Sequence, residues 1–463
     1  MSKITVGLLP LYVQFYDEIL PSLFGELEPF VARVAAVLSL GGLEVITAPT
    51  GRTQPDFAAA VRKFEADGVD AIVTLHLAYS PSLEAADALA RTELPLVMFN
   101  TTPDREFGRD VNPMRLLANH GIHGVQDLAS VLRQRGKTYR VVAGHLDDAA
   151  VVPRCVSAVR AARAARCFGT MRVLRIGGVF PGMGDFAVPD QELSRTLGVS
   201  VENIEPDCLA GAAAAIKPDA VAAEMAEDRA RYRVDCAEET HARSVRLGLG
   251  LRQFLEQGGY GAFTMNFLSF TTDAEPVSTV PFLESCKGME RGLGYAGEGD
   301  ALTAALVGSL SQGFGETTFA EIFCADWAGE SLFLSHMGEI NPAVAASRPL
   351  LYEKDYPFTA ALNPATLACA PREGAGTLVN LAPGPRGTFR LIVARVQVLG
   401  DGVHPDYERW VRGWIRPPIP LVQFLEEFSH LGGTHHSALM LGDHCSAMEA
   451  FGQFLGLEVC IIQ

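Results

Sequence analysis

The chain has 463 residues, of which 48% are hydrophobic and 20% are charged, and its formal net charge at pH 7 is -16. This length predicts two to four domains, each with a core of its own. The acidic balance argues against a nucleic-acid partner, which would require a basic face, and no apolar run is long enough to span a membrane.

Residues 1–165 are predicted to form an open α/β domain of the flavodoxin or Rossmann kind. Apolar runs alternate there with amphipathic helical patterns, which indicates a parallel sheet covered by helices on both faces. The expected strands are 4–9, 43–47, 71–77, 95–100 and 139–144. The expected helices are 29–40, 56–67, 82–91 and 115–135.

Polar side chains follow several of these expected strands. His76 and Tyr79 come after the third strand, and His145 comes after the fifth. Ligands of such sheets gather at the carboxyl ends of the strands, so these residues are candidates for contact with a small molecule. No Gly-x-Gly-x-x-Gly segment follows the first strand, and a dinucleotide site is therefore not expected.

A second α/β domain is predicted for residues 166–315, and a mainly antiparallel β domain for residues 316–463. A helix at 149–165 is expected to close the first domain. The second domain is expected to contain strands at 171–177 and 261–270 and helices at 218–232, 238–257 and 301–310. After about residue 315 glycine and proline become more frequent, helical periods disappear and β-type runs dominate. Those runs are 331–334, 377–381, 388–397 and 411–415, followed by a helix at 447–455 and a strand at 458–462.

The segment 294–300 places two carboxylates, Glu298 and Asp300, among glycines. Carboxylates suit hard cations and imidazole suits transition metals, so acids and histidines together match the shell of a divalent metal of the Mn²⁺ type. The other candidates for such a shell are Glu321, His336, His435 and His436. Taken singly, each could equally be a turn acid, a surface acid or a core histidine. Neighbours on a strand point to opposite faces, so only one of the adjacent histidines could easily bind a metal.

Several segments occur in the same order as in bacterial L-arabinose isomerase. They are 255–259, 262–264, 294–300, 303–306, 335–337 and the Gly-Gly-Thr-His-His segment 432–436. On these segments the chain resembles the L-arabinose/L-fucose isomerase family as a diverged member. The resemblance implies a three-domain architecture and an enzyme that uses a metal, usually Mn²⁺, to interconvert an aldose and a ketose.

By this resemblance, four residues occupy the family's metal positions: Glu298, Glu321, His336 and His436. The two glutamates would also serve as acid and base. The metal would hold two oxygens of an open-chain sugar, and a carboxylate would move a proton between neighbouring carbons through a cis-enediol. Asp300 is either an electrostatic partner of Glu298 or a helix cap.

The expected contacts with the sugar are Gln14, His120, His123, Phe263 and His435. His123 matches a family histidine that reaches into the site of a neighbouring subunit, whereas the family typically has glutamine where this chain has His120. The resemblance therefore implies a homo-oligomer, a trimer or hexamer, with sites at subunit interfaces.

Two segments depart from the family pattern. Residues 9–14 lack its polar sugar-contacting pattern, although Gln14 could substitute, and residues 322–327 stand where arabinose isomerases have a Tyr-rich stretch. L-arabinose and L-ribulose are the first candidate pair. The open alternatives are an isomerase or epimerase for another sugar (fucose-like, deoxy or branched pentose, tetrose) and a non-catalytic sugar-binding protein. The metal-ligand set alone would also allow a hydrolase.

The nine cysteines are scattered, odd in number and never spaced as Cys-x-x-Cys. This usage favours reduced thiols over a disulfide framework or a zinc ribbon. A cytoplasmic location is therefore expected.

Overall fold

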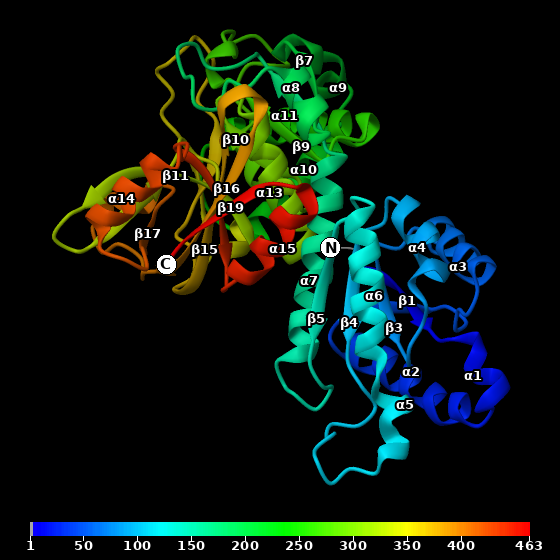
Figure 1. Ribbon diagram of the computed structural model, residues 1–463. Coiled ribbons are helices and arrows are strands. Elements are labelled where there is room, and N and C mark those ends of the chain that lie inside the picture. Colours follow the sequence, from blue (N-terminus) through cyan, green and yellow to red (C-terminus); the bar gives the residue numbers. More distant parts are fainter. Residues whose placement is uncertain (1–2) are drawn as a thin grey trace. The chain divides into compact units, whose positions relative to one another are not determined.

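The computed structural model describes residues 3–463, so the first two residues of the expected N-terminal domain lie outside the described residues. The chain forms two compact units (Figure 1). Of the described residues, the first comprises 3–166 together with 449–456, and the second comprises 167–448 together with 457–463. The three domains expected from the sequence, with limits near 165 and 315, stay a prediction. Within the described part of the chain no helix is long and apolar enough to cross a membrane.

A five-stranded, all-parallel sheet forms the centre of the first unit, with strand order β2-β1-β3-β4-β5. Its strands are β1 (Ile4–Leu11), β2 (Leu43–Thr47), β3 (Ala71–His76), β4 (Leu96–Asn100) and β5 (Tyr139–Ala143). This order is that of flavodoxin-like sheets, which bind ligands at the carboxyl ends of their strands. The predicted class of this region is confirmed.

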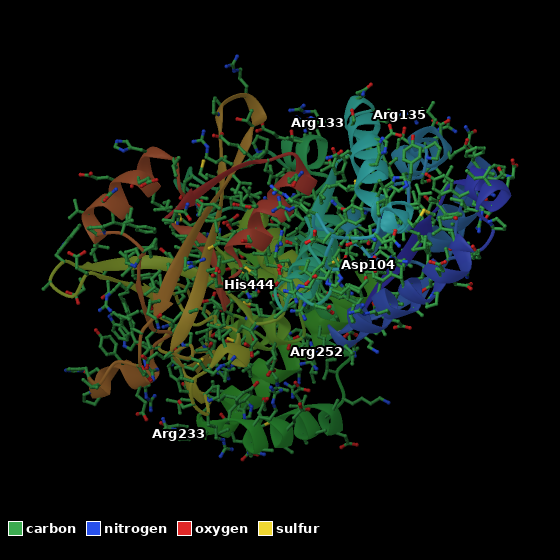
Figure 2. All side chains as sticks on the ribbon, turned by 60° about the horizontal axis from the view of Figure 1, so that its bottom comes forward. Asp104, Arg133, Arg135, Arg233, Arg252 and His444 are labelled. Carbon is green, nitrogen blue, oxygen red and sulfur yellow. The ribbon has the colours of Figure 1, made fainter. Side chains whose placement is uncertain are left out.

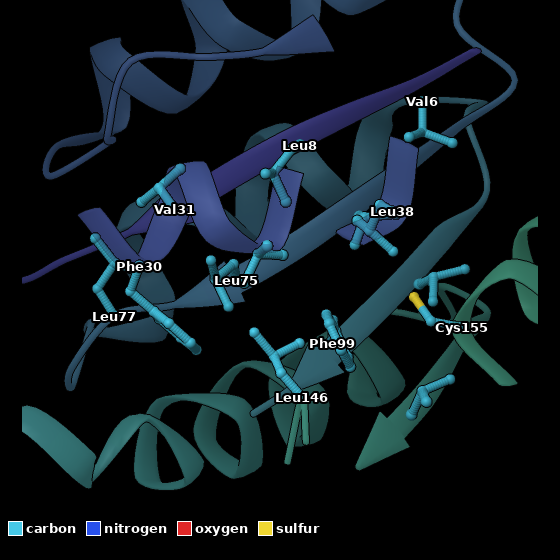
Figure 3. Packing of buried hydrophobic residues seen from close by; sticks show 14 of the residues in the cluster. Val6, Leu8, Phe30, Val31, Leu38, Leu75, Leu77, Phe99, Leu146 and Cys155 are labelled. Atoms are coloured by element: carbon cyan, nitrogen blue, oxygen red, sulfur yellow. The ribbon is translucent and has the colours of Figure 1, made fainter. Parts of the chain in front are cut away.

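Helices cover both faces of this sheet because successive side chains of each strand point to opposite sides. On one face Val6, Leu8, Leu75 and Phe99 pack against α2 (Leu23–Leu40) and α7 (Val151–Gly169), as Figure 3 shows. The other face packs against α3 (Gln54–Ala66), α4 (Ser82–Arg91) and α6 (Gly121–Gln134). A short helix, α1 (Gln14–Ile19), follows β1.

The single helix expected over 115–135 is wrong. The structure has a 3₁₀ turn, η1 (Pro113–Arg115), then α5 (Leu116–Asn119), and α6 begins at Gly121. The break coincides with a close approach of α6 to β3: a Cβ at Gly121 would lie 2.6 Å from the carbonyl oxygen of His76, and one at Gly124 would lie 2.5 Å from its ring. The two glycines therefore allow a contact that a regular helix of larger residues would prevent.

A second parallel sheet, with strand order β10-β9-β6-β7, lies in the second unit. Its strands are β6 (Arg172–Ile176), β7 (Ser200–Ile204), β9 (Ala262–Met265) and β10 (Gly294–Gly297). The surrounding helices are α8 (Asp190–Leu197), α9 (Ala210–Ala214), α10 (Pro218–Arg231), α11 (Glu238–Gly258), α12 (Phe282–Glu290) and α13 (Ala301–Phe314). The strand expected over 261–270 is shorter because the Asn266 side chain accepts a hydrogen bond from the Leu268 amide and starts a 3₁₀ turn.

Buried charges join three of these helices. On α10, Glu224 and Asp228 each lie 2.5 Å from the ammonium group of Lys287 on α12. Arg252 on α11, labelled in Figure 2, binds Glu224 at 2.7 Å and Glu284 of α12 at 3.0 Å. Burial by itself would raise the pKa of Glu224, but Arg252 and Lys287 lower it to about 2.

The C-terminal part of the second unit is a closed antiparallel barrel with strand order β15-β18-β11-β12-β17-β16, closed by the pairing of β15 with β16. The strands are β11 (Thr317–Asp326), β12 (Ser331–Ser335), β15 (Gly374–Pro383), β16 (Phe389–Val398), β17 (Gly413–Arg416) and β18 (His436–Leu441). β19 (Glu458–Ile462) runs parallel to β16. A smaller sheet, in the order β14-β13-β8, contains β14 (Ala365–Ala368), β13 (Leu350–Glu353) and β8 (Arg233–Asp235). The predicted fold class, parallel α/β followed by antiparallel β, is confirmed.

The expectation that helical periods end near residue 315 is wrong at one element. Helix α14 (Leu421–His430) follows Pro420, and it buries Leu421, Phe424 and Phe428 against the barrel. Only three residues form its apolar face, so its helical periodicity is too short to be recognised beside the neighbouring β-type runs. The final helix, α15 (Cys445–Leu455), agrees with the expected one to within two residues.

Candidate functional site

The barrel brings one acid and two histidines together by strand register. In the antiparallel ladders, Glu321 of β11 lies opposite Ser335 of β12 on one side and opposite His436 of β18 on the other. His336 directly follows Ser335. Glu321 therefore lies between the two imidazoles, although 115 residues separate it from His436 in the chain.

Glu298 reaches the same place from the end of β10. Its carboxylate oxygen Oε2 lies 3.5 Å from Nε2 of His436 and 3.8 Å from Nε2 of His435. Glu321 Oε2 lies 3.6 Å from Nε2 of His336. Two groups of potential ligand atoms result, each within 4.8 Å of one another: Glu298 with His435 and His436, and Glu321 with His336 and His436. We refer to these five residues as the acid–histidine cluster.

The glycines around Glu298 have a structural reason. A Cβ at Gly297 would lie 2.7 Å from Nε2 of His336, and one at Gly299 would lie 2.4 Å from the carbonyl oxygen of Gly178. Glu298 itself has φ +62, a left-handed conformation that is uncommon for a residue with a side chain. Such strain persists where the surrounding structure enforces it, and it concentrates at functional sites.

Each histidine of the cluster is held by a carboxylate at Nδ1. The pairs are His336 with Glu339 at 2.7 Å, His436 with Asp300 at 3.0 Å, and His435 with Asp185 at 2.6 Å. A carboxylate at Nδ1 fixes the ring orientation and leaves Nε2 for a ligand, as in the carboxylate–histidine pairs of metal sites. In all three pairs Nε2 is the nitrogen that faces a glutamate of the cluster.

These outer carboxylates are themselves fixed. Asp300 is fully buried and caps α13 by accepting a hydrogen bond from the Thr303 amide at 2.9 Å. Glu339 accepts a hydrogen bond of 2.7 Å from the Tyr295 hydroxyl. The expected helix cap is confirmed for Asp300, whereas its partner at the site is the His436 imidazole and not Glu298.

Aromatic rings enclose the cluster. The ring of Phe186 stacks on His436 at 4.8 Å between centroids and 7° between planes. Phe319 of β11 points its edge at both His336 and His436, at 4.8 and 4.9 Å. These contacts keep the imidazoles in one orientation and exclude water from their inner side.

The environment drives the pKa values of the two glutamates in opposite directions. Burial alone would raise the pKa of Glu298, but the imidazoles of His435, His436 and His336 lower it to about 2. Burial raises the pKa of Glu321. Titratable pairs separated in this way are typical of acid–base sites.

Two buried polar atoms of the cluster have no hydrogen-bond partner, Oε2 of Glu298 and Nε2 of His436. Buried polar atoms are normally paired, so an unpaired oxygen and nitrogen facing each other call for a ligand between them. Carboxylate oxygen and imidazole nitrogen together form a donor set suited to a divalent transition metal. The residues present fit such an ion.

The structure places the other expected sugar contacts as follows. Gln14 is exposed at the start of α1, the Tyr16 hydroxyl lies 3.1 Å from Nε2 of His120, and the ring of His123 lies 4.7 Å from that of Tyr79. These residues belong to the first unit, whereas the acid–histidine cluster belongs to the second. Their contact with a sugar stays a prediction.

Phe263 and His435 lie in the second unit. Phe263 on β9 is fully buried and packs against Tyr295, 5.1 Å between ring centroids, so its side chain is part of the core. His435 is itself a member of the cluster, with Nε2 3.8 Å from Oε2 of Glu298. A role in sugar binding stays a prediction for both residues.

Sequence reasoning missed the segment 177–189, which joins β6 to α8 and supplies Asp185 and Phe186. The Phe180 amide of this segment donates a hydrogen bond of 2.9 Å to the carbonyl of Glu298. The segment has no periodic pattern, and its glycines suggest only a loop. Glu339 was missed for a similar reason, because a lone acid in a turn gives no signal of a histidine partner.

Comparison with known proteins assigns most of the second unit to described domains. Residues 182–312 match the sequence model of the L-arabinose isomerase central domain, and residues 316–458 match that of the L-arabinose isomerase C-terminal domain. Together the two matches cover more than half of the chain and all of the acid–histidine cluster.

Similar curated proteins extend over nearly the whole chain. An L-arabinose isomerase from Aeromonas hydrophila is 27% identical over 443 residues, covering 91% of this chain and 86% of that protein. One from Nocardioides is 26% identical over 464 residues, covering 96% and 91%, and one from Geobacillus thermodenitrificans is 27% identical over 412 residues, covering 84% and 80%. Among solved structures, a tagatopyranose-bound solute binding protein from Agrobacterium vitis matches 67% of this chain and 88% of its own at 14% identity, with a TM-score of 0.15 that supports no comparison.

Proposed function

This chain belongs to the L-arabinose isomerase family and is an aldose–ketose isomerase, and from this premise we propose that it interconverts L-arabinose and L-ribulose with the help of Mn²⁺. The observation that supports the metal most directly is the pair of buried, unpartnered atoms on Glu298 and His436. The proposed ligands are Glu298, Glu321, His336 and His436. When bound there, the ion would hold two neighbouring oxygens of the open-chain sugar and polarise its carbonyl group.

The outer carboxylates prepare the histidines for this role. Glu339 and Asp300 lie at hydrogen-bond distance from Nδ1 of His336 and His436, which would hold each ring with Nε2 toward the site. Burial by itself would lower the pKa of both imidazoles, but these carboxylates raise it, to about 9 for His336, so a metal that binds at Nε2 would release a proton. The aromatic rings of Phe186 and Phe319 exclude water from the inner side of the imidazoles. Water exclusion strengthens the electrostatic interactions of the site and protects a reactive intermediate from side reactions.

We assign the proton transfer to Glu321. A general base works best when its pKa approaches the working pH, and burial moves the pKa of Glu321 in that direction. The pKa of Glu298, at about 2, makes it a weak base and a persistent anion. In the aldose-to-ketose direction Glu321 would remove the proton from C2, which gives a cis-enediol, and return it to C1. The proton of the C2 hydroxyl passes to the carbonyl oxygen, so no proton is gained or lost.

The test is an aldose–ketose conversion screen over pentoses, 6-deoxyhexoses and tetroses, with Mn²⁺ and with a chelator. Turnover of L-arabinose that the chelator abolishes is the expected result. Turnover of another sugar would support the isomerase reaction and identify that sugar as the substrate in place of L-arabinose. Mn²⁺ binding without any turnover would contradict the proposal and favour a sugar-binding protein.

Two variants test the assignment of the base. Glu321→Gln is expected to lose the exchange of the sugar C–H with deuterated water, while the retained amide oxygen preserves part of the Mn²⁺ affinity. Glu298→Gln is expected to lose more Mn²⁺ affinity, because it removes the persistent anion. Deuterium exchange that survives in Glu321→Gln would assign the proton transfer to another group.

The proposal extends to assembly and location. The expected His123 contact requires a homo-oligomer, trimer or hexamer, in which His120, His123 and Gln14 of one subunit would complete the site of the next. Sedimentation that shows only monomer at micromolar concentration would refute this part. The cysteines are scattered in the sequence, odd in number and never spaced as Cys-x-x-Cys, which supports a cytoplasmic location.

A further inference from the structure

The acid–histidine cluster is open to solvent on one side. The exposed fraction of the side chain is 0% for His436, 10% for Glu298 and 18% for Glu321. It rises to 31% for His435 and 37% for its partner Asp185. Among these residues the Asp185–His435 pair is therefore the most exposed to solvent.

Asp185 is held in place by two hydrogen bonds to the same oxygen. The amide of His435 donates to Oδ2 at 3.0 Å, and the Nδ1 atom of that residue lies 2.6 Å from the same atom. Because the side chain is 37% exposed and each carboxylate oxygen has two lone pairs, the other oxygen, Oδ1, can accept a further hydrogen bond. The imidazole ring of His435 separates the carboxylate of Asp185 from that of Glu298, so both border the same opening.

An aromatic surface adjoins this opening. Phe180 binds the Glu298 carbonyl through its amide, and its ring lies 5.7 Å from the ring of Phe267. Phe358, which is 49% exposed, lies 5.7 Å from Phe267 in turn. An apolar surface beside a few fixed polar groups is the usual composition of a small-molecule pocket, in which the polar groups determine specificity.

We propose that Asp185 is the specificity-determining residue of this site, accepting at Oδ1 a hydrogen bond from a sugar hydroxyl beyond the two carbons that exchange the proton. This inference rests on the proposed function, because it takes the substrate to be an open-chain sugar at the cluster. The expected ligand is an open-chain polyhydroxylated molecule. The hydroxyl that binds Asp185 would lie as far from the reacting carbons as the imidazole ring of His435 separates Asp185 from Glu298. A deoxy sugar without that hydroxyl leaves the carboxylate unpaired and binds weakly.

Pentitols test the proposal without turnover, since they carry the hydroxyls of an open-chain pentose but no carbonyl. Their binding to the Mn²⁺-loaded protein is measured calorimetrically for wild type, Asp185→Ala and the isosteric Asp185→Asn. Hydrogen bonds to charged groups are among the stronger ones, so we expect Asp185→Ala to weaken pentitol binding about 10-fold or more, Asp185→Asn to weaken it less, and Asp185→Glu to recover part of the loss. Asp207→Asn, an exposed acid on η2 (Pro206–Leu209), is the matched control and should bind like wild type.

Pentitols that lack one hydroxyl in turn identify the contact. One deoxypentitol should bind wild type as weakly as the complete pentitol binds Asp185→Ala. The affinity of that deoxypentitol should be the same for wild type and Asp185→Ala, because the hydrogen bond is absent in both cases. Mn²⁺ affinity should change by well under the ~10-fold expected when the partner of a ligating histidine is removed. Equal pentitol affinities in wild type, Asp185→Ala and Asp185→Asn would overturn the inference, and so would an equal loss for every deoxypentitol.

Turnover separates this inference from the function on which it rests. For a sugar that wild type converts, Asp185→Asn should raise KM while kcat changes little, because the contact is made before and during the reaction alike. Pentitol binding that depends on Asp185, without turnover of any sugar, would refute the isomerase and keep the inference. Turnover unaffected by Asp185 substitutions would refute the inference and keep the isomerase.

Discussion

Replacing Asp300 by Asn exchanges one carboxylate oxygen for an amino group and should reduce Mn²⁺ affinity. The carboxylate accepts two hydrogen bonds with its two oxygens, one from the Thr303 amide and one from Nδ1 of His436. An asparagine has one oxygen and one amino group in the same space, so it can accept only one of them.

The more favourable arrangement turns the amino group toward His436. The asparagine oxygen then still caps α13, a position where Asn and Asp serve equally well. His436 can accept from the amino group only as the tautomer with its proton on Nε2, the atom that would bind the metal. The opposite arrangement would leave the Thr303 amide unpaired in a fully buried place, at a cost of about 1–3 kcal/mol.

The expected result is a 10- to 100-fold loss of Mn²⁺ affinity, about 1.4–2.7 kcal/mol, with the free energy of unfolding of the metal-free protein changed by less than ~0.5 kcal/mol. Calorimetric titration with Mn²⁺ and urea denaturation measure the two quantities. Glu339→Gln should lower Mn²⁺ affinity in the same way, because Glu339 is the partner of Nδ1 of His336. Asp207→Asn should bind Mn²⁺ like wild type. Wild-type Mn²⁺ affinity in Asp300→Asn would refute the idea that the buried carboxylate sets the tautomer.

Three further outcomes are expected. Glu224→Gln should destabilise the protein by about 3 kcal/mol at pH 7, because the pKa of Glu224 is about 2 in the folded protein against an ordinary value of 4.5. Its contribution is present above pH 4.5 and is lost as the pH falls toward 2, so a difference in urea denaturation that persists at pH 2 would contradict this. Phe186→Ala removes a ring that is 2% exposed and stacked on His436. It should lower the free energy of unfolding by about 3–5 kcal/mol and should also lower Mn²⁺ affinity. Unchanged Mn²⁺ binding would show that the ring does not orient the histidine. Mn²⁺ at about 100 times its Kd should stabilise the protein by ~2.7 kcal/mol, seen as a rise in Tm that is lost in His436→Ala, and an equal rise in that variant would place the ion elsewhere.

The first unit could be predicted from sequence almost element by element. Its strands are continuous apolar runs, and its helices have apolar faces long enough to show a period, so β2 and α4 match their expected limits. The broken helix near His120 could not be predicted, because the cause of the break is a contact with β3, far away in the sequence.

The site could be predicted only in part. Glu298, Glu321, His336 and His436 were identified by resemblance, and nothing in their spacing shows that antiparallel register would bring Glu321 beside both histidines. Asp185 and Glu339 lie in segments without periodicity, so no sequence pattern indicates their histidine partners. The partner of Asp185 is 250 residues away, and that of Glu339 is three residues away. Such outer carboxylates become visible only when the fold is known.

In the proposed site, metal binding and the choice of sugar would depend on different parts of the chain, and the segment 177–189 would serve the second through Asp185. The proposed metal ligands lie in or beside strand ends of the sheet and the barrel, whereas Asp185 lies on a glycine-rich connection between β6 and α8. The exposed part of that connection, which excludes the buried Phe186, can therefore accumulate mutations without disturbing the strands that hold the reactive groups. A randomised library confined to it, selected for growth on unusual sugars, should yield new substrate preferences more often than one of equal size drawn from the barrel.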